Sequence, residues 1–167
     1  MMDFDALRDF VYAANAFDSH IHGLEHWKQV ERNGMLLASA TGADVTVVRL
    51  FSIFHDSRRW SDGFDWEHGP RGAEFAKQCR DEKRFELDDE RFEKLYYACA
   101  HHTKEPRHDD VTIDTCYDAD RLDLGRVYVF PDPHKMATEA GSRIAEEMMR
   151  ARVDFSRQRE WIQRFHF

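Results

Sequence analysis

The stretch from Ala43 to Phe54 constrains the fold more than any other, because it is apolar almost all round. A helix without a polar face has to be surrounded by other elements of the fold. The β-branched residues at positions 45–48 also favour a strand. We predict a buried helix over residues 43–57, with a buried strand as the alternative.

Apolar residues at helical spacing predict further helices on both sides of this segment. A second helix is predicted over residues 19–42, with Ser19 as its N-cap and Gly34 as a close packing point. The three- and four-residue spacing of one helical face is clearest over residues 3–17, at Phe4, Leu7, Phe10, Val11 and Ala14.

The rest of the chain divides into helices and polar loops. Helices are predicted over residues 70–85, 88–102, 111–124 and 133–152, with Pro70 in a first turn and Gly125 as a C-cap. Residues 58–69 and 103–110 are predicted loops, and residues 127–130 a short extended piece. The tail, residues 154–167, alternates apolar and basic residues, and this pattern predicts neither its structure nor its role. The predicted fold class is all-α.

Composition favours one domain over residues 1–167. The chain is 42% hydrophobic and 13% aromatic, which is enough for one continuous core. Charges of both signs are interspersed, and the formal net charge of -8 disfavours a polynucleotide as partner. A small phosphorylated molecule is compatible with this net charge, because local cationic side chains and a metal ion can make the electrostatic potential inside a pocket positive. The sequence also leaves a homodimer open.

The cysteines and the N-terminal residues indicate the cellular compartment of the protein. Cys79, Cys99 and Cys116 are an odd set without a CxxC pair, so they predict reduced thiols and a cytoplasmic protein. The first residues lack a basic segment followed by an apolar one, and Arg49 interrupts the longest apolar run. We expect no signal peptide and no membrane partner.

Histidines and carboxylates gather at three places along the chain. His22 and His26 are four residues apart, on one face of the predicted helix 19–42. His55 and Asp56 end the apolar segment, where a carboxylate is costly unless it is paired or binds a cation. Asp120 lies near the end of the predicted helix 111–124. Two imidazoles and two carboxylates form a nitrogen and oxygen set suited to Mn, Fe, Co, Ni, Zn or Mg.

Each feature has a plainer interpretation when it stands alone. The two histidines of helix 19–42 are also typical of a polar surface stripe, and the pair at positions 55 and 56 of a solvated helix end. Asp123, close to Asp120, can form a surface salt bridge with Arg121 or Arg126. Only the combination favours a metal site.

The order His, then His-Asp, then Asp on successive helices resembles the HD superfamily of metal-dependent phosphohydrolases. The segments HGLEHWKQV, LFSIFHDSRRW and YDADRLDLGRV carry the resemblance, which covers roughly residues 19–127. It implies an all-α core in which one divalent metal ion is held by His26, His55, Asp56 and Asp120.

Members of that superfamily with a second metal add two histidines between the HD pair and the last aspartate. His68 and His102 occupy the corresponding stretches here. The apolar face of Phe92, Leu95 and Cys99 continues to His102 and not to His101, so His102 is preferred. A phosphate-contacting or structural role for either histidine is the alternative.

The substrate does not follow from the resemblance. Ser57, Arg58 and Arg59 follow Asp56, so the acidic residues found there in guanosine tetraphosphate hydrolases are absent. The GYP signature of cyclic dinucleotide phosphodiesterases is also missing after His102. The resemblance leaves a small phosphorylated substrate, with nucleotides among the candidates, attacked by a metal-activated water.

Several residues near the HD pair are candidates for catalysis by their proximity in sequence. Asp62 is a candidate to orient or deprotonate the water. Candidates to neutralise the phosphate are Arg58, Arg59, Arg71, His68 and His102. The aromatic residues of the same loop, Trp60, Phe64 and Trp66, are expected in the core, with stacking on the ring of a ligand as the alternative.

Two other classes of function remain open at this point. Some HD-type proteins use two irons to activate dioxygen, and His68 with His102 would complete such a site. A non-catalytic domain that keeps the metal ligands and binds a nucleotide is the other alternative.

Overall fold

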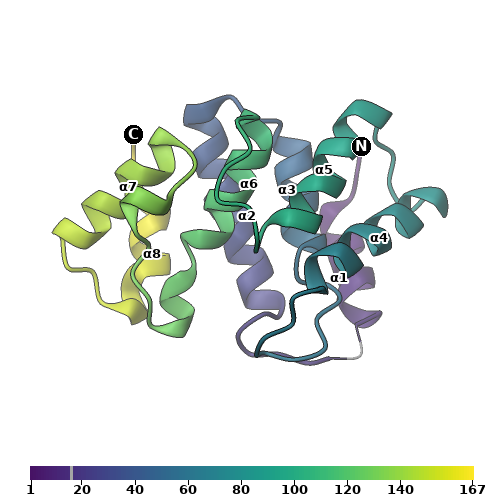
Figure 1. Cartoon of the computed structure of the whole chain (residues 1–167), viewed down its shortest axis with the longest axis horizontal. Helices are drawn as coiled ribbons and strands as arrows, with labels where there is room; N and C mark the ends of the chain where they lie inside the picture. Colours follow the sequence, from purple (N-terminus) through teal and green to yellow (C-terminus); the bar gives the residue numbers. More distant parts are fainter. Residues whose placement is uncertain (16) are drawn as a thin grey trace.

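The computed structural model describes residues 1–15 and 17–167, and all regular elements in these residues are helices (Figure 1). The predicted all-α fold class is therefore confirmed. Short 3₁₀ helices are η1 (Leu124–Val127), η2 (Pro133–Lys135) and η3 (Phe155–Arg157). The α-helices are α1 (Phe4–Ala13), α2 (Leu24–Thr41), α3 (Val45–Phe54), α4 (His68–Asp81), α5 (Asp89–His101), α6 (Val111–Arg121), α7 (Glu139–Arg150) and α8 (Gln158–Gln163).

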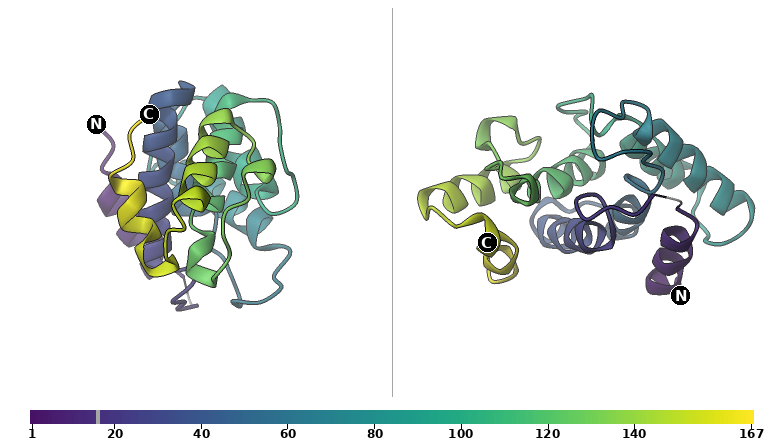
Figure 2. Two further views of the ribbon diagram at one scale, coloured as in Figure 1. Left: turned by 90° about the vertical axis from the view of Figure 1, so that its left-hand side faces the viewer. Right: turned by 90° about the horizontal axis from the view of Figure 1, so that it is seen from below.

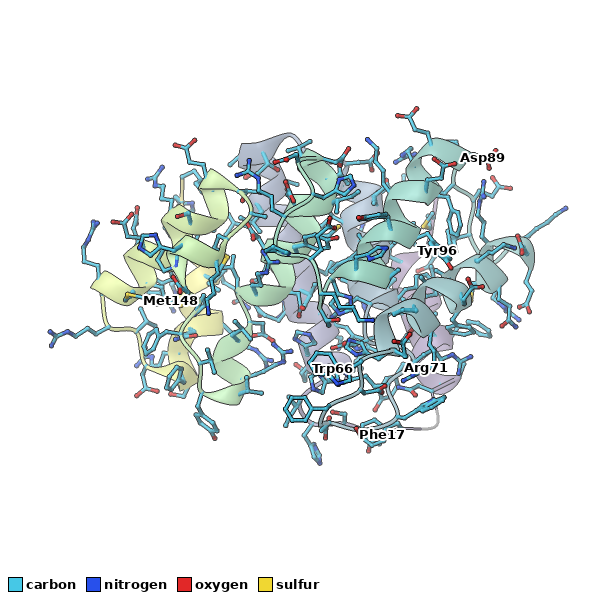
Figure 3. The ribbon with its side chains drawn as sticks, in the orientation of Figure 1. Phe17, Trp66, Arg71, Asp89, Tyr96 and Met148 are labelled. Atoms are coloured by element: carbon cyan, nitrogen blue, oxygen red, sulfur yellow. The ribbon has the colours of Figure 1, made fainter. Side chains whose placement is uncertain are left out.

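The helices α2, α3 and α6 form the middle of the molecule. α2 contacts both α3 and α6, while α3 also contacts α1, α4 and α5. Figures 1 and 2 show α7 and α8 at one end of the molecule and α1 and α4 at the other. The tail, for which the sequence predicts no structure, forms η3 and α8. Met148 of α7 and Ile162 of α8 are buried at this end, where Figure 3 labels Met148.

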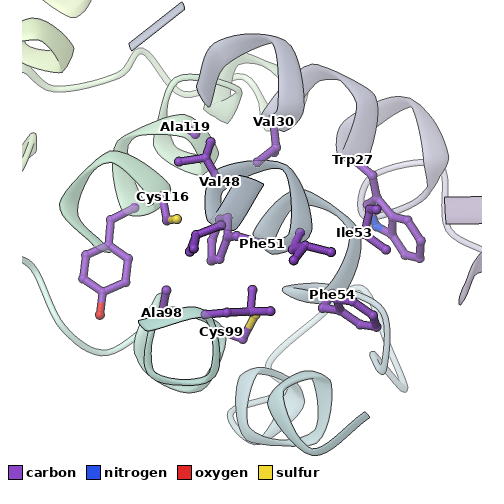
Figure 4. Close-up of a cluster of buried hydrophobic side chains, with 14 of the residues drawn as sticks. Trp27, Val30, Val48, Phe51, Ile53, Phe54, Ala98, Cys99, Cys116 and Ala119 are labelled. Atoms are coloured by element: carbon purple, nitrogen blue, oxygen red, sulfur yellow. The ribbon is translucent and has the colours of Figure 1, made fainter. Parts of the chain in front are cut away.

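The apolar segment is the central helix α3, so the prediction of a helix over a strand is confirmed. Asp44 caps this helix, because its side chain accepts a hydrogen bond from Val47 N. Its apolar side chains Val48, Phe51 and Phe54 are fully buried. Figure 4 shows Val48 and Phe51 between Val30 of α2, Cys99 of α5 and Cys116 of α6, with Phe54 to one side.

The start of α2 differs from the prediction. Ser19 is not its N-cap; the Ser19 hydroxyl instead accepts from the backbone of Ile21 and His22 and closes a turn. The helix begins at Leu24 after Gly23. His22 therefore lies in the turn before α2, not on the same helix as His26.

The segment after α6 also departs from the predictions. Because α6 ends at Arg121 and residues 124–127 tighten into η1, Gly125 is not a C-cap. Residues 127–130 form no extended piece, since Tyr128 has a left-handed backbone with a φ of 62°. Here the local interactions of the 3₁₀ turn outweigh the preference of the apolar residues for a strand.

The predicted helix 133–152 is interrupted at Thr138, which caps α7 with its side chain. The cause is Asp118, whose buried carboxylate accepts hydrogen bonds from Ala137 N and Thr138 N, each at 2.8 Å. These bonds hold the two residues outside a helix. A long-range carboxylate, rather than the local sequence, thus sets the start of α7.

None of the helices in residues 1–15 and 17–167 combines the length and the apolar character that crossing a membrane requires. Cys79, Cys99 and Cys116 are all buried as free thiols.

Gly34 allows α2 to approach its neighbours closely. A Cβ at this position would overlap Val48 Cγ1 of α3 and would lie 3.5 Å from Ala119 Cβ of α6. The glycine is therefore the close packing point that the sequence predicts. This approach matters for the site described next, because α2, α3 and α6 each contribute to it.

We expect Gly34→Ala to lower the free energy of unfolding by about 1 to 3 kcal/mol, because the methyl group forces α2 away from α3. Helix propensity acts the other way, by up to about 1 kcal/mol. Urea unfolding followed by circular dichroism measures the change. Met35→Ala, at the exposed neighbouring position, is the control and should change stability by less than about 0.5 kcal/mol. Equal stability of Gly34→Ala and the wild type would contradict the packing argument.

Candidate metal centre

The ends of three helices bring His26, His55, Asp56 and Asp120 together in what we call cluster 1. His26 lies in the first turn of α2, His55 and Asp56 directly follow α3, and Asp120 is near the end of α6. His26 Nε2 lies 3.1 Å from both His55 Nε2 and Asp120 Oδ1. Asp56 Oδ2 lies 3.4 Å from the Nε2 atoms of both histidines. The structure thus brings together the four predicted ligands of the first metal.

The other ring nitrogens fix the orientation of both imidazoles. His55 Nδ1 lies 3.1 Å from the carbonyl oxygen of Phe51 and 3.2 Å from that of Ser52. His26 Nδ1 lies 2.7 Å from Asp123 Oδ2. Because Nδ1 is the donor in these bonds, Nε2 of each neutral ring is left with its lone pair directed into the cluster.

Cluster 1 fits a divalent cation. Two nitrogen lone pairs and two carboxylates 3.1 to 3.4 Å apart repel one another unless a positive charge lies among them. Asp120 Oδ1 is buried and has no hydrogen-bond partner in the described residues. Ligand atoms with bonds of about 2.1 Å to one ion are separated by about 3 Å when the bonds are at right angles. The spacing and the chemistry of the donors therefore both suit such an ion.

His68 and His102 form a second group, cluster 2, on the other side of Asp56. Their Nε2 atoms are 3.1 Å apart, and Asp56 Oδ1 lies 3.2 Å from His68 Nε2 and 3.8 Å from His102 Nε2. His68 Nδ1 donates to the carbonyl oxygen of Asp65 at 2.6 Å, and His102 Nδ1 to that of Cys99 at 2.7 Å. Asp56 thus presents one oxygen to each cluster and can bridge two ions.

The preference for His102 over His101 agrees with this geometry. His102 is buried against cluster 2, whereas His101 is exposed and packs on Tyr97 with ring centroids 4.2 Å apart. The apolar face of α5, which turns inward, ends at His102.

Burial and neighbouring carboxylates shift the pKa values of the cluster 1 histidines in opposite directions. Burial and Arg126 oppose a charge on His26, but the adjacent carboxylates of Asp120, Asp123 and Asp56 outweigh them and raise its pKa to about 9. Burial lowers the pKa of His55 to about 3, despite the nearby carboxylates. In the metal-free protein, a proton on His26 therefore supplies the positive charge that the cluster needs.

The predicted catalytic residues of the loop between α3 and α4 divide into two groups. Arg59 Nε donates to Asp56 Oδ1 at 3.2 Å, next to cluster 2. Asp62 lies 4.0 Å from His22 Nε2, and His22 Nδ1 in turn lies 3.2 Å from Asp56 Oδ2. Arg59 and Asp62 are thus at the edge of the clusters.

The side chains of Arg58 and Arg71 bind residues of this loop and of the segments packed beside it. Arg71 binds both oxygens of Asp65 at 2.6 Å, and its guanidinium lies 3.8 Å from the centre of the Trp60 ring. Arg58 packs over the Phe75 ring and donates to the carbonyl oxygen of Ala14. These contacts bind the two side chains to residues outside both clusters.

The expectation that the loop aromatics lie in the core is wrong. Trp60, Phe64 and Trp66 are 73%, 90% and 60% exposed. The rings of Phe64 and Trp66 stack on each other with centroids 5.7 Å apart, and Figure 3 shows Trp66 on this loop in the lower part of the view. The physical reason is that Arg59 and Arg71 bind polar groups of the loop, which leaves the aromatic rings facing solvent.

Sequence reasoning missed the support of His26. Asp123 pairs with neither the Arg121 nor the Arg126 side chain as an ordinary surface salt bridge; its buried carboxylate accepts from His26 Nδ1 and, at 2.8 Å, from Arg159 Nε and Nη2. Arg126 instead donates to the Asp123 backbone carbonyl. The position of Asp123 three residues after Asp120 was a usable signal, but nothing local points to Arg159, which lies on α8.

We expect a metal ion to displace the His26 proton, because His26 must be neutral to bind it. Near pH 7, calorimetry in buffers of different ionisation enthalpy should show release of about one proton per ion, and the apparent affinity should fall about tenfold per pH unit below the pKa. The same proton stabilises the metal-free fold fully below pH 6.5, and this contribution is lost as the pH rises through about 9. Metal binding without proton release would contradict the assignment.

We also expect Arg159→Ala to weaken metal binding by about 10- to 100-fold, because Asp123 would no longer be held against His26. Arg157→Ala is the matched control, since this neighbouring arginine is exposed and pairs only with Glu160 among the described residues. Equal metal affinities of the two variants would show that Arg159 does not support the site.

No protein-family model matches the sequence, and no curated protein matches it. A solved structure is similar: the crystal structure of a predicted HD superfamily hydrolase from an uncultured Thermotogales bacterium. The similarity covers 94% of this chain and 92% of that chain, with a TM-score of 0.71 and 24% sequence identity. The resemblance inferred from the sequence is thus confirmed for the fold: this chain has the HD-type fold.

Proposed function

We propose that the protein is a metal-dependent hydrolase that cleaves a phosphoric ester or anhydride of a small phosphorylated molecule. The observation that carries the proposal is the Asp56 carboxylate between two pairs of imidazoles whose Nε2 atoms face each other at 3.1 Å. The HD-type fold adds support, since the similar Thermotogales protein is described as a predicted hydrolase.

In this proposal, the residues of cluster 1 would hold one divalent ion, and Asp56, His68 and His102 would hold a second. The nitrogen and oxygen donors suit Mn, Fe, Co, Ni or Zn, and the carboxylate side also suits Mg. A bound divalent ion would supply Lewis-acid polarisation of a phosphoryl oxygen and a water of lowered pKa. The water oxygen bonds to phosphorus, the ester or anhydride P–O bond breaks, and the leaving oxygen takes up a proton.

The chain itself supplies a route for the proton of the attacking water. His22 lies between Asp56 and the more exposed Asp62. Asp62 is fixed beside the His22 imidazole by its hydrogen bond with Ser19 Oγ. In the proposed reaction, His22 orients the Asp56 carboxylate through Nδ1, and Asp62 accepts the proton of the attacking water and passes it to solvent.

Arg59 and Arg71 have different tasks in the proposed reaction. Arg59 adds positive charge beside Asp56 Oδ1 and so favours a negatively charged phosphoryl group near cluster 2. Arg71 fixes the loop through Asp65, whose carbonyl oxygen orients His68. This gives Arg71 a positioning role.

One observation also supports a second candidate function. A carboxylate between two groups of histidines can bind two irons, so cluster 1 and cluster 2 also suit an HD-type oxygenase that activates dioxygen. Oxygen consumption by the iron-loaded protein separates this candidate from the hydrolase.

We expect Asp56→Asn to reduce metal content and to lower the rate of hydrolysis at least about 100-fold, because it removes the charge shared by both clusters. The assay uses phosphomonoesters, phosphodiesters, nucleotides and pyrophosphate with added Mn²⁺, Co²⁺ or Ni²⁺. Asp114→Asn is the matched control, since Asp114 is also buried but binds the backbone of His108 and Asp109. It should keep both its metal and its activity.

Three outcomes would contradict this proposal. Equal metal content of wild type and Asp56→Asn would exclude the two clusters as the metal site. A metal-loaded wild type that hydrolyses no substrate of the panel would favour a binding domain without catalysis. Two irons per chain with oxygen consumption would favour the oxygenase.

A further inference from the structure

Arg59 places its guanidinium at the edge of cluster 2, beside one oxygen of Asp56. Its Nε donates to Asp56 Oδ1 at 3.2 Å, and His68 Nε2 lies at the same distance from that oxygen. The Arg59 side chain is only 11% exposed, and Asp56 is its one carboxylate partner in residues 1–15 and 17–167. A nearly buried cation thus already lies at the carboxylate oxygen that an ion in cluster 2 would need.

The two clusters differ in the balance of their charges. Cluster 1 has two carboxylates, Asp56 and Asp120, and the arginine beside it, Arg126, is no closer than 3.9 Å to Asp120 Oδ1. Cluster 2 combines the two histidines with Asp56 alone, and Asp56 is shared with cluster 1. Its arginine is also closer, because Arg59 donates directly to Asp56 Oδ1. The charges therefore favour a cation in cluster 1 and oppose one in cluster 2.

The loop between α3 and α4 holds the Arg59 guanidinium in this place. Nη1 donates to the carbonyl oxygens of Ser61 at 3.2 Å and of Gly63 at 3.4 Å. The loop is closed on itself, because Trp60 N donates to Asp65 Oδ2 at 2.8 Å. A cation that binds Asp56 Oδ1 would lie a few ångströms from the guanidinium, so it has to displace Arg59 and break its contacts with the loop.

We propose that Arg59 is a built-in competitor of the second metal ion. Cluster 1 fills first, and cluster 2 fills only when Arg59 leaves Asp56 Oδ1. The released guanidinium has then lost its carboxylate partner and is free to bind a phosphoryl oxygen. The protein thereby gains its affinity for an anionic substrate only after both ions are bound. This inference rests on the two-ion site of the proposed function and concerns the regulation of that site.

The test is calorimetric titration of the metal-free protein with Mn²⁺ alone. We expect Arg59→Gln to strengthen binding of the second ion by about tenfold and to change the first by less than about threefold, because the repulsion acts mainly at cluster 2. Arg59→Lys keeps the positive charge, so its second affinity should stay within about threefold of the wild type. Circular dichroism confirms that both variants are folded.

Arg58→Gln is the matched control. It removes the same charge from the neighbouring position, but Arg58 packs over the Phe75 ring and donates to the carbonyl oxygen of Ala14, outside both clusters. This variant should leave both Mn²⁺ affinities unchanged.

Hydrogen exchange of the loop gives a second measurement. In the wild type, the amides of residues 61–64 should exchange faster when the second Mn²⁺ binds, because Arg59 then releases the carbonyl oxygens of Ser61 and Gly63. In Arg59→Gln the same amides should exchange equally fast with one ion and with two.

Three results would overturn the inference. One is an Arg59→Gln protein that binds a second Mn²⁺ no more tightly than the wild type does. Another is an Arg59→Lys protein that behaves like Arg59→Gln, which would make the effect one of packing and not of charge. The third is loop exchange in the wild type that does not respond to the second ion. Failure of the metal-loaded wild type to hydrolyse any phosphate ester contradicts the proposed function separately, because these titrations contain no substrate.

Discussion

The pairing of the buried Asp56 carboxylate with its neighbouring imidazoles and Arg59 is the interaction on which the rest of the structure depends. It directly follows α3, the most apolar helix of the fold, at a place where an unpaired charge would cost several kcal/mol. Imidazoles on both sides of the carboxylate, together with Arg59, offset this cost. The helices that surround α3 therefore serve two purposes, since they bury its apolar faces and bring charge partners to its end.

The orientation of the histidines is set mainly by backbone groups. His55, His68 and His102 each donate Nδ1 to a carbonyl oxygen three or four residues earlier in the chain, so the local fold directs their Nε2 atoms inward. His26 is the exception, because it depends on Asp123 and through it on Arg159 of α8. The C-terminal helix is thereby part of the support of the site.

The sequence predicts those features that depend on local patterns. The buried helix α3 and the choice of His102 over His101 follow from helical spacing, and the grouping of the four cluster 1 residues follows from the resemblance of the motif order to the HD superfamily. The features it missed depend on long-range contacts: Asp118 holds Thr138 out of a helix, and Arg159 reaches Asp123 from the tail. The exposed Trp60 and Phe64 show another limit, since the contacts of Arg59 and Arg71 with polar groups of the loop are not evident from the local sequence.

We propose that His26, His55, Asp56 and Asp120 together hold a divalent cation. An anomalous-difference map from a crystal of the protein soaked in Mn²⁺ tests it most directly. We expect a peak within about 2.3 Å of both His26 Nε2 and His55 Nε2, with Asp56 and Asp120 completing the ligands. A map with no peak among these four side chains, or with a Mn²⁺ peak only elsewhere on the chain, would contradict it.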